Sequence, residues 1–466
     1  MLLKNLFNKP WIQFTLLFLV INSLGLLGFF IYLPRSVFYY EYGLVLLALM
    51  YAKNYKTSFI LFVLFLIMDL LDIISNIYLF TLNELIASLQ FIDKYKTSWQ
   101  QFFYSIAIFI YLAIIFIVLK YFSPRVKSNK KVILKTLLIV YVLIFILDVI
   151  NGSSKLNSKN DTYTFTQKNI AKSLSIYYWE QIYQSFINPV AIVKLKEEPV
   201  VFKIFKEDSI GNQLVVLIES WGLINDSITQ EALQDYLSAK VKNKGYQYKW
   251  GRSPFAGPTT SAALRQMVGV KGNYKYFLHH KTDTNNIISI FDYKNKQGYT
   301  TCGFHSFSEN MFNRKIWWYN IGVQNEYFKE SYIQDNGNKK IKIVEESPFP
   351  SVDDQDMFNY MLLKTKDHIK VFSYLLTENT HLPFKLNVIE NEPVLKFKIE
   401  SLPISNEAQN QLKLIKNTVS SFIQKLDTNR WNKIIIMGDH NPPYLDIRDR
   451  NYYSFKEVPY ILIYKK

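Results

Sequence analysis

The chain has 466 residues, a formal net charge of +16 and a single cysteine, Cys302. One cysteine excludes an internal disulfide, so a domain outside the membrane must fold on its hydrophobic core alone. The positive charge is spread along the chain without a recognisable nucleic-acid-binding motif. We therefore expect no nucleic-acid partner. We expect instead that the protein acts close to anionic lipid or polymer surfaces.

The first 150 residues are rich in Leu, Ile, Phe, Val and Tyr, and they predict a transmembrane domain of five helices. A helix needs about 20 apolar residues to cross a bilayer. The segments that approach this length are 12–33, 37–51, 58–80, 102–122 and 132–150. The second segment is the weakest prediction, because it is short and contains Glu41.

The charges between these segments predict the orientation. Lys and Arg are concentrated before the first segment and in the loops that follow the second and the fourth. Positive loops stay in the cytoplasm, and five crossings then place everything after about residue 151 outside. We expect a multi-pass protein of the bacterial cytoplasmic (inner) membrane, with its second half on the periplasmic or extracellular side.

Two carboxylates interrupt the third segment. Asp69 and Asp72 are three residues apart and share one face of the predicted helix. Ionisable residues within a membrane are candidates for function. The alternative is a structural pair that is capped by Tyr or Asn from a neighbouring helix.

Residues 151–207 are expected to connect the two halves. Within them, 167–188 has apolar residues at helical spacing and predicts an amphipathic helix. Two placements are open. The helix lies along the membrane surface, or it packs on the outer domain.

Residues 208–466 are expected to form an extracytoplasmic α/β domain. Apolar strand candidates alternate with amphipathic helices, a pattern that is typical of a mostly parallel sheet flanked by helices. The candidate strands are 214–218, 298–304, 370–376, 433–437 and 460–464.

Polar side chains at three distant places predict a site with one metal ion. Glu219 follows one buried strand, and Asp439 and His440 follow another, at the edge where α/β sheets bind ligands. Between them in the chain, the hydroxyl-rich turn 257–262 leads into a helix. We expect Thr260 to be a metal ligand and the nucleophile, with Thr259 as the competing choice. This mainly oxygen ligand set suits Mn²⁺, Mg²⁺ or Zn²⁺.

Three further residues are candidates for handling a substrate. His381 follows another apolar strand and is expected to contact the substrate phosphate or to protonate the leaving alcohol. His305 and Arg314 are nine residues apart and are expected to clamp an anionic group, because Arg is suited to bidentate phosphate contacts.

Together these motifs resemble the lipoteichoic acid synthase and phosphoglycerol transferase group of the sulfatase-like, alkaline phosphatase superfamily. The resemblance implies five amino-terminal spans and an extracellular sulfatase-like domain. It implies Glu219, Asp439 and His440 as metal ligands, and the Thr-Ser match selects Thr260 as the fourth ligand and nucleophile.

The resemblance also implies a substrate pocket. A histidine followed by an aromatic-Asn-Arg segment binds phosphoglycerol in this group, which points to His305, Phe312 and Arg314. The histidine before Pro-Phe points to His381 in the same pocket. Phe312 stands where the synthases typically carry Trp, a departure that favours single transfer over polymerisation.

The expected protein is therefore a metal-dependent phospho-alcohol transferase, with Mn²⁺ as the expected metal and Zn²⁺ or Mg²⁺ as alternatives. It moves glycerol phosphate from phosphatidylglycerol to a glycan or polyol acceptor through a phospho-threonine intermediate. The alternatives are a phosphoethanolamine transferase, a phosphodiesterase with the same site, and a non-enzymatic membrane sensor or scaffold. A true sulfatase is not expected, because Cys302 lacks the Cys-x-Pro-x-Arg motif.

Overall fold

The computed structural model describes residues 9–30, 33, 35–78, 85, 99–153, 171–186, 192–254, 257–282, 286–337, 343–344, 350–381, 399–444 and 446–465. Contacts divide the chain into two compact units. One consists of Met1–Leu82 and Lys96–Ile187, and the other of Asn83–Tyr95 and Asn188–Lys466. Each unit is described by itself below.

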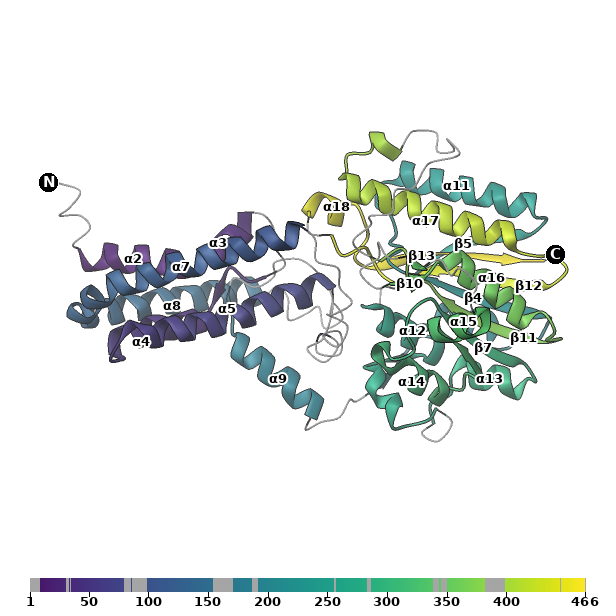
Figure 1. Cartoon of the computed structure of the whole chain (residues 1–466), viewed down its shortest axis with the longest axis horizontal. Coiled ribbons are helices and arrows are strands. Elements are labelled where there is room, and N and C mark those ends of the chain that lie inside the picture. The colour runs from purple at the N-terminus through teal and green to yellow at the C-terminus, as the bar shows by residue number, and fades with distance from the viewer. Residues whose placement is uncertain are drawn as a thin grey trace. The chain divides into compact units, whose positions relative to one another are not determined.

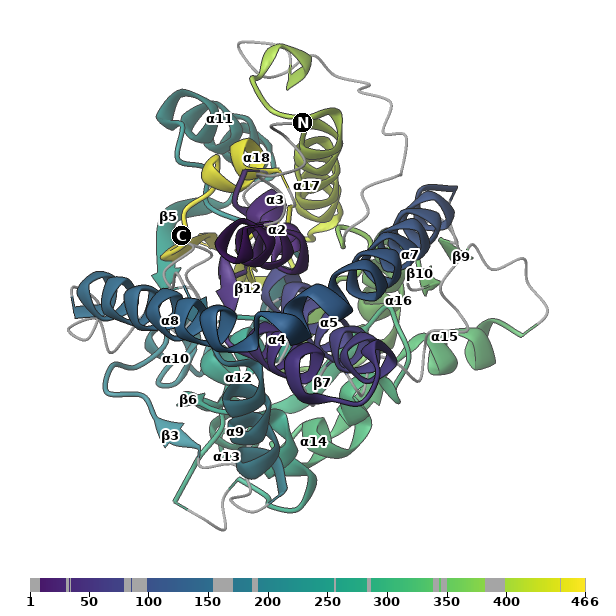
Figure 2. The same cartoon turned by 90° about the vertical axis from the view of Figure 1, so that its left-hand side faces the viewer.

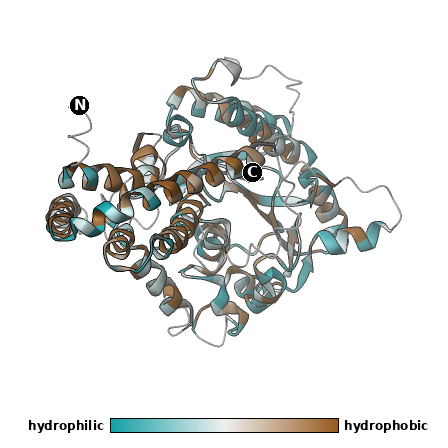
Figure 3. Ribbon diagram, turned by 60° about the vertical axis from the view of Figure 1, so that its left-hand side comes forward, coloured by the Kyte–Doolittle hydropathy of each residue, from teal (hydrophilic) through white to brown (hydrophobic). Residues whose placement is uncertain are grey.

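The first unit is helical (Figures 1 and 2), and its helices are apolar along most of their length (Figure 3). Each of the five apolar segments of the sequence contains helix. The helices are α2 (Pro10–Ile21), α3 (Ser23–Phe30), α4 (Glu41–Tyr51), α5 (Tyr55–Tyr78), α7 (Trp99–Ser128) and α8 (Lys130–Ser153), followed by α9 (Leu174–Phe186). Short strands β1 (Phe38–Tyr39) and β2 (Ala171–Lys172) complete the unit.

Fewer than five of the described helices have the length and hydropathy of a membrane span. In the part of the chain that the structure describes, Tyr55–Ile77 and Ser105–Ser128 are long and apolar enough to cross a bilayer. A third span results if α2 and α3, which are bent by 62° at their junction, cross together. Helix α4 is shorter than a span. Five spans stay a prediction.

Asp69 and Asp72 are both buried and paired. The Tyr42 hydroxyl donates to Asp69 over 3.0 Å, and Arg35 forms an ion pair with Asp69 over 3.1 Å. The Tyr39 hydroxyl donates to Asp72 over 2.6 Å, and the Lys172 Nζ lies 2.7 Å from Asp72. Tyrosine caps were the structural alternative for these carboxylates, and the observed contacts favour it over a transport role.

Strand pairing and hydrogen bonds connect the start of α9 to the other elements of the first unit. Strand β2 pairs in parallel with β1. The Ser173 hydroxyl and the Ser175 N–H both donate to Glu41, over 2.6 and 2.8 Å. The predicted amphipathic helix is thus part of the first unit. Its exposed Ile176 and Trp179 favour the prediction that it lies along the membrane surface.

The pair Lys172–Asp72 is expected to contribute strongly to the stability of the first unit. In Lys172→Met the buried Asp72 carboxylate loses this cation and keeps the Tyr39 hydroxyl, and breaking a buried ion pair from one side costs about 3 kcal/mol or more. Thermal unfolding of the full-length protein in detergent should therefore begin at a lower temperature. The exposed Lys131→Met on α8 is the matched control.

The double variant Lys172→Met/Asp72→Asn separates charge from packing. It removes both charges at once and should regain much of the lost stability, because no unpaired charge is left buried. An unfolding temperature of Lys172→Met equal to that of the wild type would show that the pair has no stabilising role.

The second unit is built on a seven-stranded sheet of order β5-β13-β12-β4-β11-β7-β8. Its strands are β4 (Asn212–Ile218), β5 (Gln247–Pro254), β7 (Thr300–His305), β8 (Asn325–Tyr327), β11 (Val371–Leu376), β12 (Trp431–Gly438) and β13 (Glu457–Tyr464). The five strands from β12 to β8 are parallel, and β13 and β5 extend the sheet in antiparallel pairing. The predicted mostly parallel sheet is confirmed.

Helices cover both faces of the sheet (Figure 1). On one face, α11 (Ser227–Asn243), α16 (Asp354–Thr365) and α17 (Asn406–Lys425) pack in one core with Leu214, Val216 and Ile218 of β4. The other face carries α10 (Val200–Phe205), α12 (Thr259–Val268), α13 (Ile290–Lys296) and α14 (Arg314–Asn320). Outside these layers lie α15 (Lys329–Asn336), α18 (Ile447–Asn451) and the paired short strands β3 (Val193–Lys194), β6 (Val270–Lys271), β9 (Ile343–Val344) and β10 (Ser351–Val352).

Successive side chains of β11 point to opposite faces of the sheet, and both faces are covered by helices. Phe372 packs against rings from α10 and α13, and Tyr374 packs against Trp318 of α14. Val371 and Leu375 point to the opposite core. A strand buried on both faces has a mostly apolar sequence. Apolar runs were the basis on which β4, β7, β11, β12 and β13 were predicted.

Candidate functional site

The site lies at the carboxyl edge of four adjacent parallel strands. Strands β12, β4, β11 and β7 are neighbours in that order. Each carries a polar residue at or just after its end, and these are Asp439, Glu219, Glu378 and His305 respectively. All four side chains are buried. The topology therefore brings together groups that are up to 220 positions apart (439 − 219) in the chain.

Glu219, Asp439 and His440 form a cluster that could hold a metal ion. One ligand atom from each lies within 4.8 Å of the others. The His440 Nε2 is 3.0 Å from the Glu219 Oε1 and 3.4 Å from the Asp439 Oδ2. These are the three protein ligands that the sequence predicted, and the structure brings them together.

The backbone around the cluster holds the two carboxylates in place. Ser220 has a φ of 57°, an uncommon conformation for a residue other than glycine, and its N–H donates to Asp439 over 2.8 Å. Its hydroxyl donates to Glu219 over 3.1 Å. At the end of β12, a Cβ on Gly438 would lie 1.8 Å from the carbonyl oxygen of Trp221, so this position needs glycine.

The charges of the cluster fit a bound cation. The Nδ1 of His440 lies 2.8 Å from the carbonyl oxygen of Asn441, which assigns the proton to Nδ1 and directs Nε2 at the carboxylates. Burial lowers the pKa of His440, but the carboxylates of Asp439 and Glu219 outweigh it and raise the pKa to about 10. The buried Oδ2 of Asp439 has no hydrogen-bond partner among the described residues. A divalent cation would satisfy this oxygen and replace the extra proton.

Thr259 supplies the hydroxyl that faces this cluster. Its Oγ1 donates to the Glu219 Oε2 over 2.8 Å and lies 3.4 Å from the His440 Nε2. Thr260, which the sequence favoured, is the next residue of α12 and is buried. Successive residues of an α-helix are rotated by about 100°, so the two side chains point in different directions. The geometry favours Thr259, the choice that competed with it.

The turn before α12 explains how Thr259 reaches the site. Gly257 adopts a φ of 97°, which is open mainly to glycine, and Pro258 caps the helix that begins at Thr259. Counting two residues from Gly257 reaches Thr259, a spacing that could have selected it from the sequence. The first N–H groups of a helix have no acceptor within the helix and favour a bound anion.

His305 and Arg314 form a buried pair. The Arg314 Nη1 lies 2.8 Å from the His305 Nε2, and the His305 Nδ1 lies 3.2 Å from the carbonyl oxygen of Leu376. Burial and the adjacent guanidinium hold the pKa of His305 well below its ordinary value, so the ring is neutral and accepts a hydrogen bond from Arg314. The structure thus brings these two predicted residues together.

The backbone before Arg314 is strained. Phe312 and Asn313 have φ values of 55° and 52°, in the left-handed region that β-carbons disfavour. The ring of Phe312 lies 5.3 Å from the guanidinium carbon of Arg314. Two such residues in succession turn the chain so that Arg314 begins α14 with its side chain buried. Strain of this kind is common at ligand sites.

Sequence reasoning missed a second layer of polar residues after β11. Glu378 is buried, and its Oε2 lies 3.8 Å from the His305 Nε2. Asp354 accepts the N–H groups of Glu378 and Asn379 over 2.9 and 2.8 Å, and the Ser306 hydroxyl over 2.5 Å. A polar run after a buried strand, Thr377–Thr380 in the sequence, was the available signal.

His381 ends the described part of this loop. Its N–H donates to the carbonyl oxygen of Glu378 over 3.0 Å. Its positive charge would help to lower the pKa of Glu219, although His440 has the larger effect and burial opposes both. The Pro-Phe pair that follows it lies outside the described residues, so the placement of His381 in a substrate pocket stays a prediction.

No family model and no curated protein matches this chain. Its structure is similar to solved structures of the lipoteichoic acid synthase LtaP from Listeria monocytogenes (17% identity, 59% of this chain and 69% of that one, TM-score 0.39). It is also similar to the phosphoglycerol transferase GacH from Streptococcus pyogenes in complex with sn-glycerol-1-phosphate (16%, 56% and 72%, TM-score 0.36).

A third similar structure covers the membrane half as well. It is the integral membrane protein lipooligosaccharide phosphoethanolamine transferase A (EptA) from Neisseria meningitidis (12% identity, 96% of this chain and 88% of that one, TM-score 0.44). These structures include a lipoteichoic acid synthase and a phosphoglycerol transferase, the group that the sequence motifs resemble. Because every one of these TM-scores is below 0.5, activity and substrate must be argued from the residues of the site.

Proposed function

We propose that this protein is a membrane-bound, metal-dependent transferase that moves a phospho-alcohol headgroup from a phospholipid to a hydroxyl of an extracytoplasmic glycan or polyol. The observation that carries the proposal is the cluster at the sheet edge, where two carboxylates, an imidazole and a threonine hydroxyl meet within hydrogen-bond reach. Phosphatidylglycerol is the proposed donor, and the transferred group is glycerol phosphate.

Glu219, Asp439 and His440 would hold the metal. Mn²⁺ is the proposed ion, and Zn²⁺ and Mg²⁺ suit the same ligands. When bound, it would act as a Lewis acid that favours ionisation of the threonine hydroxyl and stabilises charge on phosphoryl oxygens.

Thr259 is the proposed nucleophile, in place of Thr260. Its hydroxyl already points its proton at the Glu219 carboxylate. Attack of the Thr259 Oγ1 on phosphorus breaks the bond to the diacylglycerol oxygen, and His381 would protonate that leaving oxygen. The acceptor hydroxyl then attacks the phospho-threonine and releases Thr259, so two displacements complete one transfer.

Arg314 is the proposed anchor of the transferred phosphate. Its Nη1 is held by the neutral ring of His305, while the guanidinium has further N–H groups for a phosphate. Phe312 lies next to the guanidinium and limits its movement. A buried arginine keeps its charge, so the site attracts an anionic group without a change in protonation.

The membrane half would present the donor lipid. Besides the described candidate spans, α8 exposes apolar side chains including Leu138, Val142, Phe145 and Ile150, which water would not solvate well. This exposure supports the proposal that α8 also crosses the bilayer, and that the chain crosses five times with the catalytic unit outside. The positive loops then lie in the cytoplasm.

The test is donor turnover by the full-length protein in lipid nanodiscs with Mn²⁺. Diacylglycerol should be released from phosphatidylglycerol, and a glycan or polyol acceptor should gain glycerol phosphate. Release from phosphatidylethanolamine instead would change the proposed headgroup and leave the proposed mechanism unchanged. Transfer to water alone would make the protein a phosphodiesterase. No release from either lipid would contradict the proposal.

Arg314→Lys is expected to lower kcat/KM for the donor by about 10- to 100-fold, because a lysine replaces a planar fork of donors with a single ammonium. Lys249→Gln, an exposed change on β5, is the control for non-specific charge effects. An Arg314→Lys enzyme with wild-type kcat/KM would exclude Arg314 as the phosphate anchor.

A further inference from the structure

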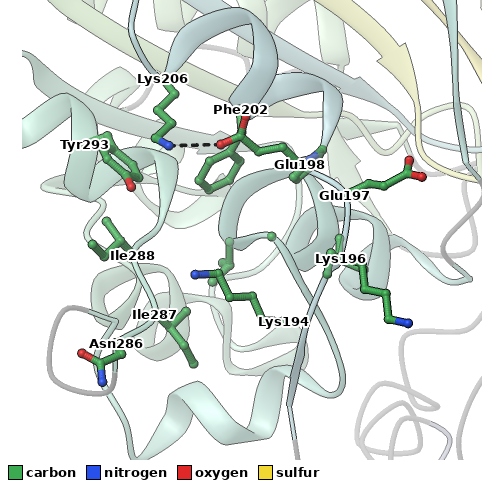
Figure 4. A pocket seen from close by; sticks show the side chains of 14 residues that line it. Lys194, Lys196, Glu197, Glu198, Phe202, Lys206, Asn286, Ile287, Ile288 and Tyr293 are labelled. Carbon is green, nitrogen blue, oxygen red and sulfur yellow. Dashed lines mark hydrogen bonds and ion pairs between the residues drawn. The ribbon is translucent and has the colours of Figure 1, made fainter.

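A cavity lies in the second unit, and its lining includes none of Glu219, Asp439 and His440. It has a volume of about 330 Å³, which is within the size range of small-molecule sites. Its walls come from the segment that begins with β3, from α10, from the end of α12 and from the start of α13. Figure 4 shows the side chains that line it.

The walls are held by backbone contacts. Strand β3 pairs with β6, so that Lys194 stands opposite Val270. The Leu195 N–H donates to the carbonyl oxygen of Gly269 over 2.9 Å. The Val201 N–H donates to the side chain of Gln266 over 3.4 Å. The cavity is therefore built into the fold between β3, α10 and α12.

Its lining combines three lysines with two glutamates, a tyrosine hydroxyl and apolar surface. In Figure 4 the side chains of Lys194, Lys206 and Tyr293 face the same space, with Ile287 and Ile288 along one side. Lys206 is bound to Glu198 over 3.1 Å. Lys194 has no carboxylate within ion-pair distance among the described residues, so its charge is available to a ligand.

We propose that this cavity binds the phosphate ester of a small polyol. Lys194 would receive the phosphate as a charge-assisted hydrogen-bond donor. Tyr293 and the Glu198–Lys206 pair would bind hydroxyl groups, and the isoleucines would contact the carbon backbone. A purely apolar ligand does not fit a lining with an unpaired ammonium, and a simple anion would not use its apolar side.

Helix α12 links this cavity to the proposed nucleophile. The helix begins at Thr259 and ends at Val268, a cavity wall. Ten helical residues span about 15 Å, which separates the two sites by a length that a short chain of phosphorylated polyol units can bridge. The role as an acceptor subsite rests on the proposed function, whereas the recognition of a polyol phosphate rests on the lining alone.

Lysine acetylation footprinting of the full-length protein tests the proposal. The protein in detergent is treated with an amine-acetylating reagent, with and without sn-glycerol-1-phosphate, and each lysine is followed by mass spectrometry. At a ligand concentration of about ten times Kd, only about one site in ten is unoccupied. The acetylation of Lys194 should therefore slow about tenfold. Glycerol at the same concentration should not protect Lys194, and Lys249 should be unaffected by either compound.

A second arm identifies the source of the ligand. Nanodiscs of phosphatidylglycerol, compared with phosphatidylcholine and without soluble ligand, would protect Lys194 if the polyol phosphate is a lipid headgroup. Protection by the soluble compound alone would indicate an acceptor. Absence of protection by both, or equal protection of Lys249, would overturn the proposal.

The footprint does not depend on turnover. Thr259→Ala protein should show the same protection of Lys194 as the wild type. If Lys194 is protected and no lipid is cleaved, the result supports the polyol-phosphate site and contradicts the proposed transferase activity. If lipid is cleaved and Lys194 is not protected, the reverse holds.

Discussion

Thr259→Ala is expected to abolish the covalent intermediate, and Thr260→Ala to retain it. After incubation with phosphatidylglycerol and Mn²⁺, mass spectrometry of the wild-type protein should find a glycerol-phosphate adduct of Thr259. The Thr259 hydroxyl donates to Glu219 and lies close to the His440 ring. Loss of a nucleophile removes the whole covalent route, so turnover should fall by at least about 10³-fold.

Thr260→Ala is the matched control because it removes the same hydroxyl one residue further along the same helix. It should keep the adduct and most of the turnover, apart from any loss of packing at this buried position. An adduct on Thr260, absent in Thr260→Ala and present in Thr259→Ala, would reverse the assignment. An adduct in neither wild type nor control would remove the covalent mechanism altogether.

The difference between the two threonines shows what the sequence could decide. That a hydroxyl-rich turn before a helix would reach the metal ligands was predictable from composition and order. The choice between neighbours depends on the rotation of α12, which begins at Thr259 behind Pro258. A one-residue uncertainty in a helix start changes the direction of a side chain by about 100°, and the spacing from Gly257 is the local pattern that points to Thr259.

The strands of the sheet also differ in how far their own sequences predict them. Strands β4, β11 and β12 have continuous apolar sequences, because both faces are buried, and they could be predicted directly. Strand β5 (Gln247–Pro254) has a polar sequence with Gly251 inside it and lies at the edge of the sheet. Its strand conformation comes from pairing with β13, a contact more than 200 residues away in the chain.

The proposed metal ligands could be found in the sequence because they follow strongly apolar strands, where a polar residue is unexpected. The partners that orient them were harder to find. Ser220 acts through an unusual backbone angle, and Asp354 acts from the start of α16 on a loop that follows β11. Both effects arise from tertiary geometry, which the order of residues along the chain does not specify.

Asp439→Asn is expected to empty the metal centre. The wild-type protein, purified with Mn²⁺ and dialysed, should hold close to one equivalent of metal, measured by mass spectrometry of the elements. Loss of even a residue that only orients a metal ligand weakens binding by about 10- to 100-fold, so replacement of a carboxylate ligand should weaken it by at least about 100-fold. Turnover of phosphatidylglycerol should fall with the metal content.

Metal should also stabilise the catalytic unit, and this gives a readout that is independent of turnover. At a free concentration of about 100 times Kd, a ligand that binds only the folded state adds about 2.7 kcal/mol to the free energy of unfolding. Adding Mn²⁺ to chelator-treated wild type should therefore raise the unfolding temperature, and Asp439→Asn should not respond. Asp226→Asn, which keeps a capping side chain at the start of α11, should respond like the wild type.

The opposite result has an equally definite meaning. If wild type and Asp439→Asn hold no Mn²⁺, Zn²⁺ or Mg²⁺, and neither is stabilised by these ions, the cluster is a buried network of one histidine and two carboxylates. The proton on the His440 Nε2 would then neutralise the carboxylates that it contacts, over 3.0 Å for Glu219 and 3.4 Å for Asp439. Such a network would support a non-enzymatic sensor or scaffold, because no metal cation would then favour ionisation of the Thr259 hydroxyl.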